Sequence, residues 1–183
     1  MTKFICISGK AQSGKDTSAA VLREFLEKSG FKTLIIHYGD LLKFICKTAF
    51  GWNGEKDEAG REMLQRVGTD CIRQHNPNYW VDFIVEFVKM FPEEWDYVIV
   101  PDTRFPNEVE RVREAGFEVT HIRIVRDDYE DNMTSRQRKH ESETALDNVV
   151  PDRIVANTTI SRLREQLELV AQLLSIDGED VYR

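Results

Sequence analysis

The chain has 183 residues, 41% hydrophobic and 31% charged, a balance that fits one folded domain and excludes a disordered chain. Its 32 acidic residues outnumber its 25 lysines and arginines, and the net charge of −7 excludes a nucleic-acid polymer as partner unless a local basic patch forms. No apolar run is long enough to cross a bilayer, so we expect no membrane partner.

The cysteines indicate a reducing compartment. Cys6, Cys46 and Cys71 are odd in number and lack C-x-x-C spacing, so the sequence indicates neither a disulfide framework nor a zinc cluster. We therefore expect a cytoplasmic protein. Isolated cysteines of this kind are usually buried as small apolar side chains, and we expect the same here.

The N-terminal segment has the pattern of a βαβ unit. The apolar run FICIS at residues 4–8 predicts a strand, and apolar residues at helical spacing predict a helix over 17–28. KTLIIH at 32–37 predicts a second strand, which Tyr38-Gly39-Asp40 ends.

Strand and helix patterns continue to alternate through the rest of the chain. Periodicity predicts helices over 41–50, 61–74, 80–91, 107–115 and 160–174, and strands over 97–100, 118–125 and 153–156. This alternation predicts a three-layer α/β fold with a mostly parallel central sheet. Residues 126–139 are polar, highly charged and without a clear period, a length that suggests a functional lid.

The sequence GKAQSGKDT at residues 9–17 follows the first predicted strand and opens the first predicted helix. Backbone N–H groups of such a glycine-rich loop surround phosphate oxygens, and the helix N-terminus favours negative charge. Lys15 would reach the β- and γ-phosphates, and Thr17 would bind phosphate oxygens or position Mg²⁺. The alternative is a glycine-rich turn with a surface lysine.

Asp16 departs from the usual phosphate loop, in which Ser or Thr follows the lysine directly. The ending GKDT is similar to the GKGT of adenylate kinases, with Asp in place of Gly. A carboxylate here either organises hydrated Mg²⁺ or caps the helix N-terminus, and both interpretations stay open.

The sequence VPDTRFPNE at residues 100–108 follows the third predicted strand. If that strand neighbours the first, Asp102 and Arg104 lie near the phosphate loop. Asp102 could bind a Mg²⁺ water or hold a phosphate-binding group, and Arg104 offers a planar fork of donors to an acceptor phosphate. The alternative is an Asp turn followed by a solvated arginine.

The segment 126–143 carries several cations, which are Arg126, Arg136, Arg138 and Lys139. Phosphoryl transfer needs groups that neutralise the phosphate oxygens, so a closing segment with guanidinium groups is chemically useful. Arg136 and Arg138 are our catalytic candidates, although an ordinary solvated loop is the alternative. His140 is expected to make a polar lid contact, because no partner spacing supports a metal site.

Taken in order, these motifs resemble the bacteriophage and bacterial deoxynucleoside monophosphate kinases of the P-loop nucleoside monophosphate kinase group. The resemblance rests on GKAQSGKDT, GREMLQRVGTDCIR at 60–73, VIVPDTRFPNEVE at 98–110, HESE at 140–143 and Asn157. It implies a single P-loop NTPase domain over 1–183, with acceptor-binding helices at 38–92 and a lid at 126–143. It also implies transfer of the γ-phosphate of ATP, with Mg²⁺, to a nucleoside or deoxynucleoside monophosphate.

The resemblance also implies roles for individual residues. Catalysis would involve Lys15, Asp102, Arg104, Arg136 and Arg138. The donor nucleotide would be bound by Gly9, Lys10, Ser13, Gly14, Lys15, Asp16, Thr17 and Asn157, and the metal by Asp16, Thr17 and Asp102. The acceptor would be bound by Asp40, Arg61, Gln65, Arg73, Trp80, Arg104 and His140. The indole of Trp80 either stacks on a base or anchors the core.

Two other functions remain open from the residues. A kinase of the same fold that acts on dephospho-coenzyme A or phosphomevalonate would keep the phosphate loop and the lid. A non-catalytic module would use ATP only to close the lid as a switch. The expected partners are small nucleotides, and the acceptor base, the preference for deoxyribose and the formation of a homodimer stay undetermined.

Overall fold

A five-stranded sheet forms the centre of the protein in the computed structural model, which describes residues 2–126 and 133–179. The strand order is β2-β3-β1-β4-β5, and every neighbouring pair is parallel. The predicted parallel sheet is therefore confirmed. The strands are β1 (Lys3–Ser8), β2 (Thr33–Ile35), β3 (Tyr97–Val100), β4 (Glu118–Val125) and β5 (Arg153–Ala156).

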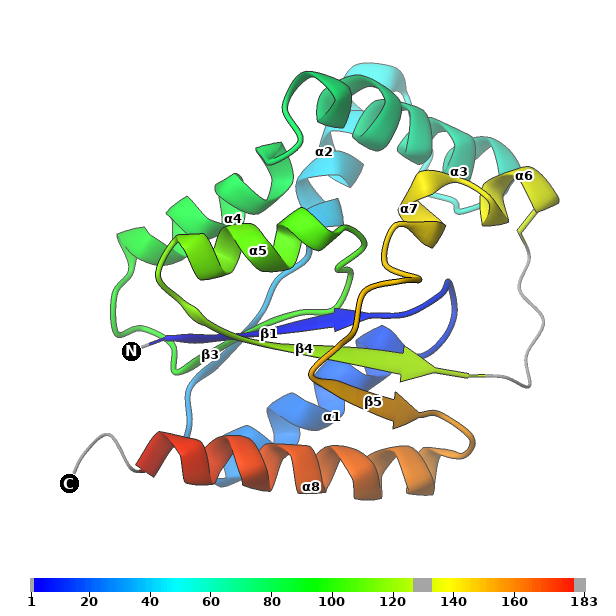
Figure 1. Ribbon diagram of the computed structural model, residues 1–183. Coiled ribbons are helices and arrows are strands. Elements are labelled where there is room, and N and C mark those ends of the chain that lie inside the picture. Colours follow the sequence, from blue (N-terminus) through cyan, green and yellow to red (C-terminus); the bar gives the residue numbers. More distant parts are fainter. Residues whose placement is uncertain (1, 127–132, 180–183) are drawn as a thin grey trace.

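Helices cover both faces of the sheet, as expected for a three-layer fold (Figure 1). The helices are α1 (Lys15–Lys28), α2 (Tyr38–Phe50), α3 (Glu58–Gln65), η1 (Arg66–Arg73), α4 (Tyr79–Met90), α5 (Pro106–Glu114), α6 (Ser135–Arg138), α7 (Glu141–Thr144) and α8 (Ile160–Glu179). Helices α1 and α8 pack on one face, and α4 and α5 pack on the other. None of the helices described combines the length and apolar content needed to span a bilayer.

Burial on both faces of the sheet explains why the central strands are almost entirely apolar. In β1, Ile5 and Ile7 join the core beneath α1 and α8, whereas Phe4 joins the core beneath α4 and α5. Successive side chains of a strand point to opposite faces, so a strand between two helical layers is apolar at consecutive positions. The central strands thus contribute side chains to two separate cores, one on each face of the sheet.

The prediction of one regular helix over 61–74 is wrong. The chain forms α3 and then turns into the π-helix η1, whose wider turns change which side chains face inward. Val67, Gly68 and Thr69 are buried, and Cys71, expected among the buried thiols, is exposed. At Gly68 a Cβ atom would lie 2.6 Å from a methyl carbon of Leu42, so the missing side chain lets η1 approach α2.

The predicted lid, residues 126–143, is described only in part, because residues 127–132 lie outside the described residues. Its described portion forms the short helices α6 and α7, which lie beside α3 (Figure 1). The amide of buried Gln137 donates to the carbonyl oxygen of Glu58 at 3.3 Å, and His140 lies 3.3 Å from a carboxylate oxygen of Asp70. The segment therefore rests on the helices expected to bind the acceptor.

A buried histidine links β1 and β4. His121 Nε2 lies 2.8 Å from the hydroxyl of Ser8, and its backbone N–H donates to Asp152 at 2.7 Å. Burial, aided by the charge of Arg123, lowers the pKa of His121 to about 4. The folded protein therefore holds this imidazole neutral at pH values where the unfolded chain protonates it.

This difference predicts a loss of stability in acid. Between pH 6.5 and pH 4 the unfolded chain binds more protons at His121, so the free energy of unfolding falls as the pH falls. From pH 7 to pH 5, wild type should lose about 2 kcal/mol more than His121→Gln, measured by urea unfolding at each pH. The control is His75→Gln, at an exposed position, which should follow wild type. An equally steep loss in His121→Gln would contradict the prediction.

Candidate active site

The loop between β1 and α1 has a backbone that only glycine fits at two positions. Gly9 has φ +146° and Gly14 has φ +98°, both in the region that side chains disfavour. A Cβ at Gly9 would lie 2.5 Å from the carbonyl oxygen of Ile124, and one at Gly14 would lie 2.4 Å from the amide nitrogen of Asn157. The loop therefore turns tightly against β4 and against the turn after β5.

The same loop carries groups suited to phosphate oxygens. Among the described residues, Ser13 Oγ is the one buried side-chain polar atom without a hydrogen-bond partner. Lys15 Nζ donates to the carbonyl oxygens of Gly9 at 2.8 Å and Lys10 at 2.7 Å. Burial, aided by nearby Arg104, lowers the pKa of Lys15 to about 8. An unsatisfied hydroxyl and a partly desolvated ammonium at a helix N-terminus fit an anionic ligand.

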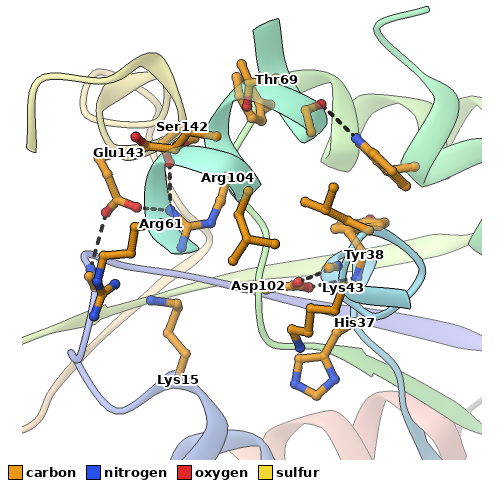
Figure 2. A pocket seen from close by; sticks show the side chains of 18 of the residues that line it. Lys15, His37, Tyr38, Lys43, Arg61, Thr69, Asp102, Arg104, Ser142 and Glu143 are labelled. Atoms are coloured by element: carbon orange, nitrogen blue, oxygen red, sulfur yellow. Dashed lines mark hydrogen bonds and ion pairs between the residues drawn. The ribbon is translucent and has the colours of Figure 1, made fainter. Parts of the chain in front are cut away.

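Asp102 and Arg104 lie beside this loop because β3 pairs directly with β1, which was the condition of that prediction. The carboxylate of Asp102 accepts from the backbone N–H of Tyr38 at 3.0 Å and of Gly39 at 2.8 Å (Figure 2). Asp102 thus holds the N-terminus of α2 against the end of β3. The sequence analysis did not predict that Asp102 accepts from these two backbone N–H groups.

Arg104 meets the lid. Its NH1 donates to the carbonyl oxygen of Ser142 at 2.9 Å and pairs with the carboxylate of Glu143 (Figure 2). The other carboxylate oxygen of Glu143 accepts from the N–H of Ala11 in the phosphate loop at 3.3 Å. Glu143 belongs to the HESE motif, but sequence reasoning assigned no role to it.

A buried ion pair supports the turn that carries Arg104. Glu108 pairs with Arg73 and accepts from the backbone N–H of Arg104 at 2.6 Å and of Phe105 at 3.0 Å. Burial raises the pKa of Glu108, and Arg73 and the two amides oppose that rise. The guanidinium of Arg73 also lies 3.7 Å from the centre of the Phe105 ring and donates to Asn107 at 3.1 Å. Arg73 is therefore held by protein groups, and its predicted contact with the acceptor stays a prediction.

These groups surround a cavity of about 730 Å³ that lies between the phosphate loop, α2, η1 and the lid. Its apolar lining residues include Leu42, Leu64, Trp80, Phe105 and Met133. Its charged lining residues are the cations Lys15, Lys43, Lys56, Arg61, Arg73 and Arg104 and the carboxylates Asp16, Asp102, Glu108 and Glu143, and Gln65 and Thr69 also line it. Lys43 and Lys56 were not predicted, because a lone lysine carries no motif. A chain of net charge −7 thus gathers cations around one cavity.

Trp80 belongs to the wall of this cavity and to the core beneath α4. Its indole N–H donates to the carbonyl oxygen of Gly68 at 3.1 Å, and the side chain packs among Val81, Ile84 and Val100. These contacts agree with the core-anchor interpretation. Because the residue also lines the cavity, stacking on a base stays a prediction.

Asp16 lies at the edge of the cavity, and a hydrogen bond with His37 at 3.0 Å lowers its pKa. The same bond raises the pKa of His37. Asp40 pairs with Lys43 at 2.8 Å and does not line the cavity. Thr17 is exposed on α1 and does not line it either. The structure therefore brings Asp16 to the predicted site and leaves Asp40 and Thr17 outside it.

The two lid arginines predicted to be catalytic are not the lid arginine that lies beside the phosphate loop. Arg136 and Arg138 are exposed and line neither of the two cavities described here. Arg126 instead lines a smaller cavity of about 300 Å³ beside the loop, and its NH1 lies 3.5 Å from the carbonyl oxygen of Gln12. His140 caps α7 and contacts Asp70, which agrees with a polar lid contact.

The remaining predicted residues are distributed around the loop. The amide of Asn157 donates to the carbonyl oxygen of Ser13 at 2.8 Å, so it holds the phosphate loop. Lys10 Nζ donates to the carbonyl oxygen of Glu143 at 2.6 Å and pairs with Asp147. The side chain of Lys10 thus ties the loop to the segment after α7.

The parallel sheet and the phosphate loop together have the fold of P-loop kinases. A sugar kinase from Janibacter sp. HTCC2649 superposes with a TM-score of 0.54 at 14% identity, over 93% of this chain and 92% of that one. An APS kinase from Mycobacterium tuberculosis, solved with AMPPNP and APS, superposes with a TM-score of 0.51 at 12% identity, over 95% and 98% of the two chains. At these identities the likeness shows the fold alone.

The chain belongs to the deoxynucleotide monophosphate kinase family, whose model matches residues 35–167. It is 36% identical over 72 residues to the deoxynucleotide monophosphate kinase of Enterobacteria phage T4, covering 38% of this chain and 30% of that protein. It is 28% identical over 113 residues to that of Escherichia phage RB69, covering 60% and 43%. The matched part of this chain covers less than half of the length of either relative. The resemblance found in the motifs is confirmed.

The ion pair beneath Arg104 predicts a large effect on stability. Glu108→Ala leaves the charge of Arg73 buried without its partner and frees two backbone N–H groups, so the free energy of unfolding should fall by about 3 kcal/mol. Glu110→Ala, at an exposed position on the same helix, is the matched control and should change it little. Denaturant unfolding compares the two variants, and equal losses would show that Glu108 is not the anchor of this turn.

Proposed function

We propose that the chain is a kinase that transfers the γ-phosphate of ATP, with Mg²⁺, to a nucleoside or deoxynucleoside monophosphate. The carrying observation is that the phosphate loop and Arg104 open onto the same cation-rich cavity. Phosphoryl transfer is catalysed mainly by positioning and by neutralisation of charge, and this arrangement supplies both. Membership of the deoxynucleotide monophosphate kinase family supports the choice of acceptor.

The donor half of the site is the phosphate loop. Its N–H groups and the hydroxyl of Ser13 would bind phosphate oxygens, and Lys15 would exchange its two carbonyl partners for the β- and γ-phosphates. Asn157 holds the loop in place from the side. The structural neighbour solved with AMPPNP and APS supports a fold that receives a nucleotide and a second substrate together.

The residues present fit a hydrated magnesium ion held mainly by phosphate. Among the residues that the structure describes, no three His, Cys, Asp or Glu side chains come together as a direct metal site. Asp16 and Asp102 line the cavity and would bind water molecules of the ion. Thr17, exposed on α1, is the weakest of the predicted metal residues. Bound Mg²⁺ would neutralise charge on the phosphates.

The acceptor half is the opposite part of the cavity. Arg104 would bind the acceptor phosphate, with Arg61, Lys43 and Lys56 close enough to line the same space. The base would pack against the apolar lining residues, and Gln65 and Thr69 would offer hydrogen bonds to its edge. The lid would exclude water so that the phosphoryl group passes to the acceptor.

The proposal predicts turnover that requires both ATP and magnesium. At least one of the common ribo- and deoxynucleoside monophosphates should be phosphorylated in a coupled assay of ADP release, and EDTA should abolish the reaction. Binding of ATP without turnover of any of them would favour the switch interpretation. Turnover of dephospho-coenzyme A or phosphomevalonate alone would reassign the acceptor.

Two variants separate the donor and acceptor halves. Lys15→Ala removes the ammonium that follows the transferred group, so kcat should fall on the order of a hundredfold. Arg104→Ala should weaken monophosphate binding, as the guanidinium fork is lost, and should leave ATP affinity near that of wild type. Calorimetry with each nucleotide measures the two affinities. Lys28→Ala, at the exposed end of α1, is the control, and equal loss of both affinities in Arg104→Ala would contradict the division.

A further inference from the structure

The lid helix α7 holds one side of the Arg104 guanidinium. NH1 carries two N–H groups, and α7 supplies an acceptor for each of them, the carbonyl oxygen of Ser142 at 2.9 Å and the carboxylate of Glu143. Within the described part of the chain, no group accepts from Nε or NH2 of this arginine. The edge formed by Nε and NH2 is therefore left for a ligand.

We propose that Glu143 is a positioning residue, which orients Arg104 so that its Nε–NH2 edge meets the acceptor phosphate only when the lid rests on the phosphate loop. This inference depends on the proposed kinase function. An Arg fork binds phosphate with two parallel hydrogen bonds, so a rotation of the guanidinium plane loses one of them. Fixing NH1 fixes that plane.

The contacts of Glu143 join three parts of the site. Its side chain is only 6% exposed, so its carboxylate has little water to stabilise its charge. One oxygen pairs with Arg104, and the other accepts from the N–H of Ala11 in the phosphate loop at 3.3 Å. Lys10 of the same loop donates to the backbone carbonyl of Glu143 at 2.6 Å. The carboxylate reaches Arg104 from a helix that the phosphate loop itself holds.

The opposite side of the lid is held by the acceptor helices. His140, at the start of α7, accepts from the N–H of Ser142 at 3.2 Å and contacts Asp70 of η1 at 3.3 Å. The backbone of Arg104 is fixed separately, since Glu108 accepts from its N–H at 2.6 Å. Arg104 is thus held at its base by the core and at its tip by the lid. Only the second support depends on the lid.

A different role for the same carboxylate makes the opposite prediction. If Glu143 stood in for a phosphate on Arg104 and Ala11, an incoming phosphate would have to displace it, and removing it would tighten binding. The open Nε–NH2 edge favours positioning, because the guanidinium can serve both anions at once.

The experiment compares Glu143→Ala and Glu143→Gln with Glu141→Ala, an exposed position on the same helix. The monophosphate turned over fastest by wild type is used for kinetics and calorimetry. For Glu143→Ala we expect kcat/KM for that monophosphate to fall on the order of a hundredfold, as for a misplaced reacting group, with a much smaller change in ATP affinity. Added acetate should restore part of the loss, because a free carboxylate can take the vacated place. Glu141→Ala should behave as wild type.

Two further measurements exclude a merely structural effect. The NH1 N–H signals of Arg104 in a ¹⁵N NMR spectrum should be protected from exchange in wild type, where Ser142 and Glu143 accept from them, and should be less protected in both Glu143 variants. In an Arg104→Ala background, Glu143→Ala should cause no additional loss of monophosphate affinity. Tighter monophosphate binding, no rescue by acetate, an unchanged Arg104 signal or an additive loss would each overturn the proposal.

If the proposed kinase function is wrong, these experiments give a different set of results. If wild type turns over no monophosphate, the proposed function is rejected. The NMR comparison, together with calorimetry of the deoxynucleoside monophosphates as ligands, then still decides whether Glu143 orients Arg104. An Arg104 signal that does not depend on Glu143 would overturn the inference in that case as well.

Discussion

A single buried carboxylate, that of Glu108, supports the turn on which the site depends. Burial of a carboxylate is unfavourable unless its oxygens are satisfied, and here Arg73 and the backbone N–H groups of Arg104 and Phe105 satisfy them. These contacts join η1, the end of β3 and the start of α5. Because β3 lies next to β1, the turn is held beside the phosphate loop. The position of Arg104 thus follows from the sheet order and from one buried ion pair.

The site concentrates positive charge in a protein that is acidic overall. Lysines and arginines gathered around one cavity repel one another, and the effect is visible in Lys15, whose pKa is lowered to about 8 by burial and by Arg104. Carboxylates placed among them offset this repulsion, with Glu143 on Arg104 and Asp16 on His37. Arg104 and His37 are therefore each held by a carboxylate, which under the proposed function would limit the reorganisation required during transfer.

Local patterns in the sequence were sufficient for the strands, the phosphate loop and the neighbourhood of Asp102 and Arg104, because each depends on a short motif and on the rules of parallel sheets. They failed where tertiary packing decides. The close approach of η1 to α2 depends on the absence of a side chain at Gly68, where a Cβ would collide with Leu42, and no periodicity reveals that contact. The HESE motif contains Glu143 but indicates no role for it, because its partners lie in segments far away along the chain. The prediction for Arg136 and Arg138 rests on their charge, which does not say where a side chain points.

The family match begins at residue 35, after the phosphate loop, and so covers the acceptor helices, the Arg104 turn and the lid. A phosphate loop occurs in many kinases, whereas under the proposed function these later segments would recognise the acceptor and keep water away from the phosphoryl group. Glu143 connects the two parts, since it touches Ala11 of the loop and Arg104 of the turn. If Arg104 is correctly oriented only while the lid rests on the loop, transfer to water through an open lid is disfavoured. The same contact then serves both the rate of transfer and the choice of acceptor.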